Sequence, residues 1–303
     1  MGNDKNNKMT KTINPKDIST GEFHALMLGA IAPRPIAFAS TIDKEGNVNL
    51  SPFSFFNAFG SNPPLLIFSP ARRVRDNTIK HTLENVLEIP EVVINIVNFA
   101  MVEQMSLAST EYEKGVNEFV KAGFTEIKSD KIRPPRVAEA PVAFECIVQQ
   151  VIQTGTQGGA GNLIICEIIM AHFNENILDE NGKINTPKMD LVARMGGDYY
   201  CRVIPEALFE IPKPLVSKGI GFDNLPSHVR ESHILSANNL GRLANVEKLP
   251  TAEEIQTFKD STDFYQIFHD RFVMNKENLH HQARVFLEEN DVKTAWLTLS
   301  LLS

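Results

Sequence analysis

Cationic and hydroxyl-bearing side chains gather between residues 34 and 82 of this 303-residue chain. Arg34, Arg75 and Lys80 can together neutralise a phosphate dianion through charge-assisted hydrogen bonds. Hydroxyl groups that can donate hydrogen bonds to a phosphate or to a polyol chain lie among them, at Ser40, Thr41, Ser51, Ser54, Thr78 and Thr82. This mixture predicts a binding site for a phosphorylated ligand. A solvated turn is the alternative interpretation of Arg72, Arg73 and Arg75.

Two strands are expected to carry the first half of this site. Apolar and small residues alternate over residues 35–42, Gly46 suits the turn that follows, and residues 48–56 return as the partner strand. Pro52 lacks a backbone N–H, so it places this point of the strand at a sheet edge, a bulge or a strand end. An interrupted ladder leaves backbone N–H and C=O groups available to a ligand.

A helix is expected to carry the second half of the site. Apolar side chains recur at helical spacing over residues 76–89, and Asp76, Asn77 or Thr78 could cap the first turn. The free N–H groups and the positive dipole end of that turn would then lie beside Arg75 and Lys80. Both features favour an anion at this position.

Strand patterns dominate the rest of the first 204 residues. Strands are expected over residues 65–69, 92–97, 141–154 and 162–173, with short helices over 101–108 and 112–122. Successive antiparallel strands predict a β-barrel with helical excursions rather than a doubly wound α/β fold. The glycine-rich segment 155–161 has neither Walker spacing nor a Lys-Ser or Lys-Thr ending, so a hairpin turn is favoured over a phosphate cradle.

A boundary near residue 205 is expected to divide the chain into a barrel domain, residues 1–204, and a mainly helical C-terminal extension, residues 205–303. Prolines interrupt the start of the extension, and a capping box at Thr251–Glu254 then opens a helix that reaches about residue 271. Further helices are expected over residues 278–289 and 293–301. His280 and His281 would point about 100° apart on such a helix, which favours a solvated helix face over a metal site.

Composition excludes several classes of partner. The net charge of −7 argues against a surface for nucleic acid or acidic membrane, because both require clustered cations. No apolar stretch approaches the roughly 20 residues of a membrane-spanning helix, and the polar start resembles no secretion signal, so we expect a cytoplasmic protein. Cys146, Cys166 and Cys201 are isolated in sequence, which predicts buried, inert thiols rather than disulfides or a zinc site.

Several short motifs follow one another in a fixed order along the barrel domain. They are Arg34-Pro-x-Ala-x-x-Ser-Thr, Asn49-x-Ser-Pro-Phe-Ser-Phe-Phe-Asn57, Asn62-Pro-Pro, Lys80-His-Thr-Leu-x-Asn85 and Val93-Ile-Asn95, with Pro141-Val-Ala-Phe-Glu-Cys146 and Ala193-Arg-Met-Gly-Gly-Asp-Tyr199 further on. In order and spacing this set resembles the flavoredoxin-like and flavin reductase-like proteins of the FMN-binding split-barrel superfamily. Each motif is weak by itself, but together they make a strong signal, and the resemblance covers about residues 20–203.

The resemblance implies a site for the phosphate of FMN. The family holds this phosphate with the arginine of the first motif and with a Lys-Asp-Thr sequence at a helix start. The corresponding residues here are Arg34, Lys80, His81 and Thr82, and His81 departs from the usual aspartate. Residues 72–79 look like an insertion relative to shorter members. Three of its residues could therefore share or take over the phosphate contact: Arg75, Asn77 and Thr78.

The resemblance also implies the ring contacts and the reaction. The isoalloxazine ring would lie along Ser40, Thr41, Ser51, Pro52, Phe53, Ser54 and Asn57. The protein would be a homodimeric flavoprotein that takes electrons from NADH or NADPH and passes them through FMN to a flavin, a metal chelate or another acceptor. Two alternatives stay open: an electron carrier that a protein partner reduces, and a split barrel that binds without catalysing. Because the cofactor performs such chemistry, no catalytic residue is indicated and no metal is expected.

Overall fold

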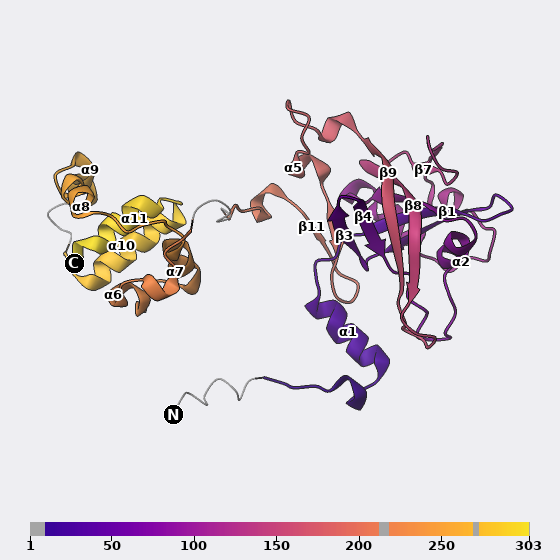
Figure 1. Ribbon diagram of the computed structural model, residues 1–303, viewed down its shortest axis with the longest axis horizontal. Helices are drawn as coiled ribbons and strands as arrows, with labels where there is room; N and C mark the ends of the chain where they lie inside the picture. The colour runs from indigo at the N-terminus through magenta and orange to yellow at the C-terminus, as the bar shows by residue number, and fades with distance from the viewer. Residues whose placement is uncertain (1–9, 212–217, 269–272, 303) are drawn as a thin grey trace. The chain divides into compact units, whose positions relative to one another are not determined.

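The computed structural model describes residues 10–211, 218–268 and 273–302. The chain divides into two compact units, Met1–Phe209 and Glu210–Ser303, which we call the barrel unit and the helical unit (Figure 1). Each unit buries apolar clusters of its own. Among the described residues, no helix is long and apolar enough to span a membrane.

An antiparallel sheet of seven strands forms the framework of the barrel unit. Its strand order is β2-β1-β5-β8-β9-β4-β3, so β2 and β3 lie at the two edges. These strands are β1 (Ala37–Ile42), β2 (Val48–Phe53), β3 (Phe56–Ser61), β4 (Pro64–Phe68), β5 (Glu91–Ile96), β8 (Val142–Gln153) and β9 (Asn162–Phe173). Two short hairpins accompany the sheet: β6 (Glu126–Ile127) with β7 (Arg136–Val137), and β10 (Val192–Arg194) with β11 (Tyr200–Arg202).

The sheet curls so that its distant strands meet. β2 and β4 are far apart in the strand order, yet the rings of Phe53 in β2 and Phe68 in β4 lie 5.5 Å apart between centroids. Both rings belong to one buried cluster with Ala39 and Ile94 of the central strands. An open, flat sheet could not bring these side chains together. The β-barrel with helical excursions that the sequence predicts is therefore confirmed.

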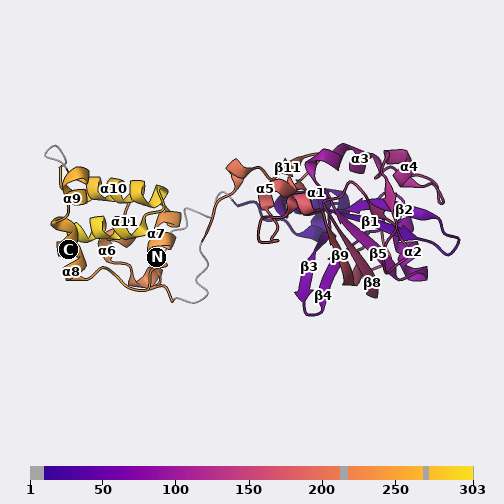
Figure 2. The ribbon, with the colours of Figure 1, turned by 90° about the horizontal axis from the view of Figure 1, so that it is seen from above.

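Helices cover both faces of β1 and β2 (Figure 2). Alternation along β1 sends Phe38 and Ala39 to opposite faces. On the face of Ala39, α2 buries Leu83, whereas α3 and α4 bury Met105 and Phe119 against Phe38 on the other face. The helices of this unit are α1 (Thr20–Ala30), α2 (His81–Glu88), α3 (Val102–Leu107), α4 (Glu118–Ala122) and α5 (Thr186–Met189).

The helix beside the cations begins later than the sequence pattern predicts. α2 begins at His81, because Asp76 Oδ1 accepts hydrogen bonds from the N–H (3.0 Å) and the hydroxyl (2.6 Å) of Thr78. Asn77 between them adopts a left-handed conformation with φ of 58°. Such local hydrogen bonds compete with a helix, so the predicted cap at residues 76–78 is wrong. Lys80 is the N-cap residue and makes no side-chain cap.

The helical unit packs its helices around two buried clusters. Trp296 is buried in the first cluster and donates an indole hydrogen bond to the carbonyl of Leu243 at 3.1 Å. His280 is buried while His281 is exposed, so the predicted solvated face is wrong for His280. The helices are α6 (Ser227–Arg230), α7 (Ala237–Ala244), α8 (Ala252–Lys259), α9 (Thr262–Ile267), α10 (Lys276–Glu288) and α11 (Val292–Leu299).

Candidate functional site

A cavity of about 510 Å³ opens at the end of edge strand β2. This volume is in the range of small-molecule sites. The cavity brings together the end of β2, the helix α3 with the turn that follows it, and the β10–β11 hairpin. The side chains that line it include Pro52, Phe53, Ser54, Ser106, Ser109, Arg194 and Tyr200.

Backbone groups are free where β2 enters this cavity. Pro52 pairs with Phe38 of β1 and lies in an edge strand, the first of the three positions that the sequence leaves open for it. The ladder with β1 ends at Phe53. Within the described part of the chain, the backbone N–H groups of Ser54 and Phe55 donate no hydrogen bond. They are therefore available to the polar edge of a bound heterocycle.

Arg34 has a buried guanidinium group that is already engaged. It donates hydrogen bonds to the carbonyls of Leu28, Ile31 and Met195, the last at 2.8 Å, and to the hydroxyl of Ser54 at 3.4 Å. Burial and the neighbouring Arg194 guanidinium lower the pKa of Arg34. In this structure Arg34 joins the end of α1 to the β10–β11 hairpin and positions Ser54. The geometry gives no support to a direct phosphate contact.

Thr82 and Asn49 belong to a chain of buried hydrogen bonds between α2 and β2. Thr82 donates its hydroxyl hydrogen to Asn49 Oδ1 at 2.7 Å, and Asn49 Nδ2 donates to Glu118 Oε1 at 2.9 Å. Burial raises the pKa of Glu118, which also accepts the N–H of Leu50. Thr41 is likewise buried and accepts from Asn85 Nδ2 at 3.0 Å. These hydroxyl groups hold α2 on the sheet.

The loop before α2 is braced by the glycine-rich hairpin between β8 and β9. Asn77 Nδ2 donates to the carbonyl of Thr156 at 3.0 Å. The N–H of Arg72 donates to the carbonyl of Ala160 at 2.8 Å, and the carbonyl of Arg72 accepts the N–H of Gly159 at 2.9 Å. A Cβ at Gly158 would lie 3.0 Å from the carbonyl oxygen of Arg73. The glycines therefore allow close approach of two backbones, as a hairpin tip rather than a phosphate cradle.

Arg73, Arg75 and Lys80 form a group that we call the cation cluster. Glu111 bridges the two arginines, with Oε1 2.8 Å from Arg73 Nε and Oε2 2.9 Å from Arg75 Nη2. Lys80 is half-buried, and its pKa is lowered by burial and by the charge of Arg73. Its ammonium group makes no ion pair with any described residue. The uncapped N–H groups that begin α2 follow Lys80 directly.

The structure thus places the expected residues in two neighbouring groups. Pro52, Phe53 and Ser54 line the cavity, whereas Arg75 and Lys80 belong to the cation cluster. Other expected residues lie outside both groups. Ser40 and Ser51 are buried within their strands. Asn57 is exposed, and its Oδ1 accepts the N–H of Ala58. The internal contacts described above occupy the side chains of Thr41, Asn77, Thr78 and Thr82.

The segment 106–111 connects the two groups, and no pattern in the sequence indicates it. Ser106 and Ser109 line the cavity, and Glu111 binds the cation cluster. These residues share no motif, and only tertiary contact brings them to the site. Arg73 was visible in the sequence, but its separation from Glu111 along the chain gave no signal of their pairing.

Comparison with known proteins decides the family. Residues 28–190 match the model of the flavin reductase like domain, and all of them lie in the barrel unit. The chain belongs to the flavin reductase-like family. An uncharacterised protein of Aquifex aeolicus is 37% identical over 196 residues, which are 65% of this chain and 97% of that protein.

Two solved structures resemble this chain in fold as well as in sequence. Nitrilotriacetate monooxygenase component B from Bacillus cereus is 29% identical with a TM-score of 0.63, covering 67% of this chain and 100% of that one. Pseudomonas fluorescens 2-nitrobenzoate 2-nitroreductase NbaA is 28% identical with a TM-score of 0.60, covering 69% of this chain and 100% of that one. The split-barrel fold of the flavin reductase-like domain is thus shown.

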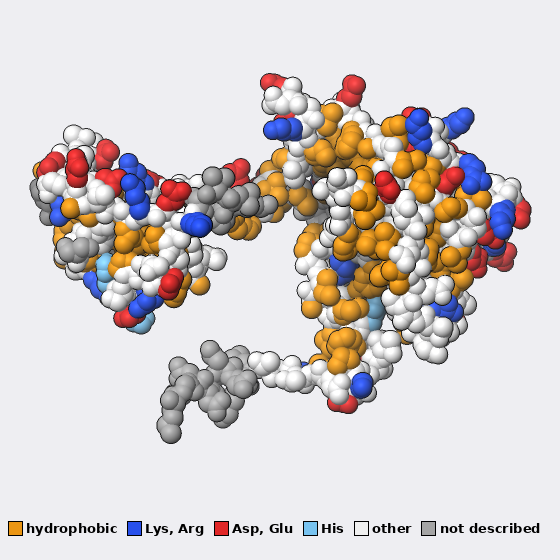
Figure 3. All heavy atoms as spheres, in the orientation of Figure 1, with side chains coloured by type: hydrophobic (Ala, Val, Ile, Leu, Met, Phe, Trp, Pro, Cys, Tyr) orange, Lys and Arg blue, Asp and Glu red, His pale blue; other side chains and the backbone are white. Residues whose placement is uncertain are grey.

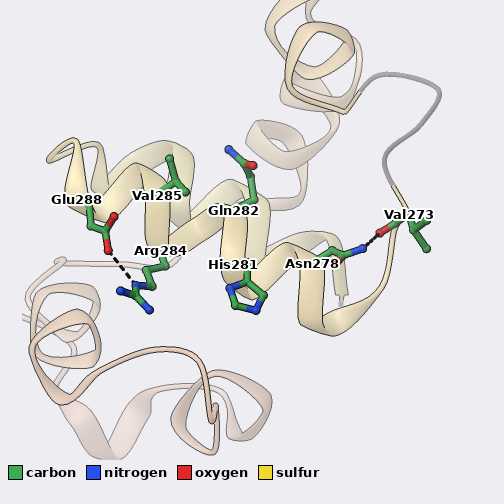
Figure 4. Close-up of a pocket in the computed structure, with 7 residues that line it drawn as sticks. All are labelled: Val273, Asn278, His281, Gln282, Arg284, Val285 and Glu288. Atoms are coloured by element: carbon green, nitrogen blue, oxygen red, sulfur yellow. Dashed lines mark hydrogen bonds and ion pairs between the residues drawn. The ribbon is translucent and has the colours of Figure 1, made fainter.

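A second hollow of about 510 Å³ lies on the helical unit, outside the flavin reductase-like domain (Figure 4). Most of its lining comes from α10, where Arg284 pairs with Glu288 at 2.8 Å and Asn278 donates to the carbonyl of Val273. The side chains of Arg284 and Glu288 are both exposed and pair with each other along α10. Among the described lining residues, the only two that are always charged neutralise each other, so this hollow is a weaker candidate site than the cavity at the end of β2.

Asp130, Glu145 and His172 bring three possible metal-ligand atoms within 4.8 Å of one another. The buried Glu145 carboxylate, however, accepts the N–H groups of Asp130 (2.8 Å) and Lys131 (2.7 Å) and lies 2.7 Å from His172 Nε2. These hydrogen bonds lower the pKa of Glu145 against the opposing effect of burial. Its oxygens are committed to holding the 130–131 loop on β8 and β9.

Proposed function

We propose that this protein is an FMN-binding oxidoreductase that passes electrons from NADH or NADPH through the flavin to a flavin, a metal chelate or another acceptor. The cavity at the end of β2 carries the proposal, because it combines free backbone N–H groups, serine hydroxyls and apolar walls within the flavin reductase-like domain. The names of the similar structures, a monooxygenase component and a nitroreductase, agree with redox chemistry.

The residues present fit a phosphorylated flavin in two parts. Phe53 and Met105 offer apolar surface to a ring, and the N–H groups of Ser54 and Phe55 can donate to its polar edge. The cation cluster and the first N–H groups of α2 can bind a phosphate dianion. When bound, FMN would supply hydride acceptance at N5, and the chain would orient the flavin and exclude water from one face.

We propose further that two copies of the chain form a homodimer. Large apolar side chains are exposed near the end of α1, on edge strand β3 and in the β10–β11 turn, as Ile31, Phe59 and Tyr199 show. Figure 3 shows hydrophobic side chains over much of the visible face of the barrel unit. A second copy would remove this surface from water. Light scattering of the purified protein is expected to give twice the mass of one chain.

Oxidation of NADH or NADPH tests the proposed reaction. Purified protein with added FMN should oxidise at least one of the two nucleotides, with free flavin or ferric chelate as acceptor, faster than FMN alone. Absence of this activity, together with bleaching of bound flavin by a reduced protein partner in stopped flow, would replace the enzyme with an electron carrier. A purified protein that binds no flavin would leave only the non-catalytic alternative.

A further inference from the structure

We propose that the Glu111 carboxylate occupies the phosphate position of the cation cluster and is displaced when a phosphate monoester binds there. Glu111 would then set how strongly the site prefers phosphorylated flavin over riboflavin. This inference rests on the proposed flavin function and adds a residue that the family motifs do not contain, because Glu111 lies in the turn after α3.

The geometry of Glu111 is that of a bridging oxyanion. Each carboxylate oxygen contacts a different guanidinium group, Arg73 at 2.8 Å and Arg75 at 2.9 Å. Hydrogen bonds from Arg75 and Arg73 lower the pKa of Glu111, so the carboxylate stays ionised at neutral pH. A phosphate monoester can present two oxygens to the same two groups and a third to Lys80.

The charges of the cluster favour exchange of the carboxylate for phosphate. The cation cluster carries three positive charges. Two carboxylates oppose them: Glu111, and Asp76, which pairs with Arg75 at 2.9 Å. Asp76 is held by the N–H and hydroxyl of Thr78, so it is fixed in its own loop. Lys80 keeps an unpaired ammonium group that a phosphate dianion can neutralise.

The Glu111 contact is also weak enough to be displaced. The side chains of Glu111 and Arg75 are 44% and 73% exposed, so water screens this ion pair and it contributes little to stability. Arg73 is 19% exposed, so its pair with the exposed Glu111 carboxylate is screened less. Phosphate binding beside half-buried Lys80 replaces a screened contact with several charge-assisted ones. Displacement would free the turn that carries Ser109 into the cavity, which couples the phosphate group to the cavity wall.

Replacement of Glu111 by glutamine tests the exchange. In E111Q the competing charge is gone, so FMN affinity measured by quenching of flavin fluorescence should rise about threefold to fivefold. Riboflavin affinity should not change, because riboflavin lacks the phosphate. The matched control is E113Q, which removes an exposed carboxylate of the same turn that makes no ion pair with a described residue. Circular dichroism verifies the fold of both variants.

Calorimetric titration with inorganic phosphate gives a readout that does not depend on flavin. E111Q is expected to bind phosphate more tightly than the wild type and E113Q, and this result would support the inference even if neither flavin binds and the proposed function fails.

Equal phosphate binding by all three proteins would overturn the inference. So would an E111Q variant that loses FMN and riboflavin affinity together, since Glu111 would then only brace the loop. Wild-type protein that binds FMN no better than riboflavin, with E111Q unchanged, would reject the inference and leave the flavin function intact.

Discussion

Individual side chains of the site divide into those that hold the scaffold and those that remain free for a ligand. Arg34 donates hydrogen bonds to carbonyl groups, and Thr82 donates its hydroxyl hydrogen to Asn49. Both side chains are therefore engaged within the protein. Lys80 differs, because its ammonium group is half-buried and has no acceptor among the described residues. Burial disfavours the charge of Lys80 and the attraction of Glu111 offsets this only in part, so we expect Lys80 to depend strongly on a bound anion.

Replacement of Lys80 by alanine is expected to weaken FMN binding about tenfold or more. A hydrogen bond to a charged group contributes roughly 1.5–3 kcal/mol, and each 1.4 kcal/mol corresponds to about tenfold in affinity. Riboflavin should bind K80A and wild type alike in the same fluorescence titration. Lys44→Ala, in the exposed β1–β2 turn, is the matched control and should leave both affinities unchanged. Equal loss of riboflavin binding in K80A would contradict a phosphate role.

His280 gives the helical unit a dependence on pH. Ser232 Oγ accepts the N–H groups of Ile234 and Leu235, so its hydroxyl hydrogen is donated to His280 Nδ1 at 2.7 Å, and the ring is neutral. Burial, followed by the charges of Lys276, His228 and His281, lowers the pKa of His280 to about 4 from an ordinary 6.5. Between these values the unfolded chain binds the proton and the folded chain does not, so stability falls as pH falls from 6.5 to 4.

Denaturant unfolding followed by Trp296 fluorescence at pH 7 and pH 5 measures this dependence. The wild type should unfold at lower denaturant at pH 5. In His280→Asn the side-chain oxygen still accepts from Ser232 but carries no titrating group, so the shift between the two pH values should shrink. Exposed His281→Gln is the control and should keep the wild-type shift. An undiminished shift in His280→Asn would assign the dependence to other groups.

At the scale of elements, the sequence predicts strands well and helix starts poorly. The expected strand over residues 162–173 coincides with β9. Apolar residues alternate over this long segment, and a strand is the element that places them all on the buried face of the curled sheet. The predicted start of α2 is wrong because Asp76 accepts hydrogen bonds from the N–H and the hydroxyl of Thr78, and helix propensity does not reveal these local bonds. The site follows the same division. Pro52 was located from its chemistry, whereas Glu111 reaches Arg73 only through the fold.

The β8–β9 hairpin approaches the loop before α2 so closely at Gly158 that a side chain there should displace the loop. A Cβ in Gly158→Ala would lie 3.0 Å from the carbonyl oxygens of Arg73 and Val74, so the loop must shift, at a cost of about 1–3 kcal/mol. FMN affinity should fall more than riboflavin affinity, because the displaced loop carries the cation cluster. Gly21→Ala in α1 meets no atom within 4 Å and should change neither. Unchanged FMN binding in Gly158→Ala would mean that the loop does not position the phosphate.

At the scale of the whole molecule, the buried clusters of the described residues each form within one unit. Phe38, Phe53 and Leu83 belong to clusters formed within the barrel unit, and Leu287 and Trp296 to a cluster formed within the helical unit. The residues of the cavity and the cation cluster all come from the barrel unit. We therefore expect the two units to fold independently.

Separate expression of residues 1–209 and 210–303 tests this independence. The first segment is expected to bind FMN with the affinity of the full chain, and the second to show a cooperative unfolding transition in Trp296 fluorescence. Trp296 is the single tryptophan of the chain, so this signal reports the helical unit alone, in the full chain as in the fragment. If residues 1–209 fold by circular dichroism but bind FMN at least tenfold more weakly, the helical unit contributes to the flavin site. If residues 210–303 give no transition, their clusters need the barrel unit to form, because the buried apolar surface within the fragment is then too small to offset its conformational entropy.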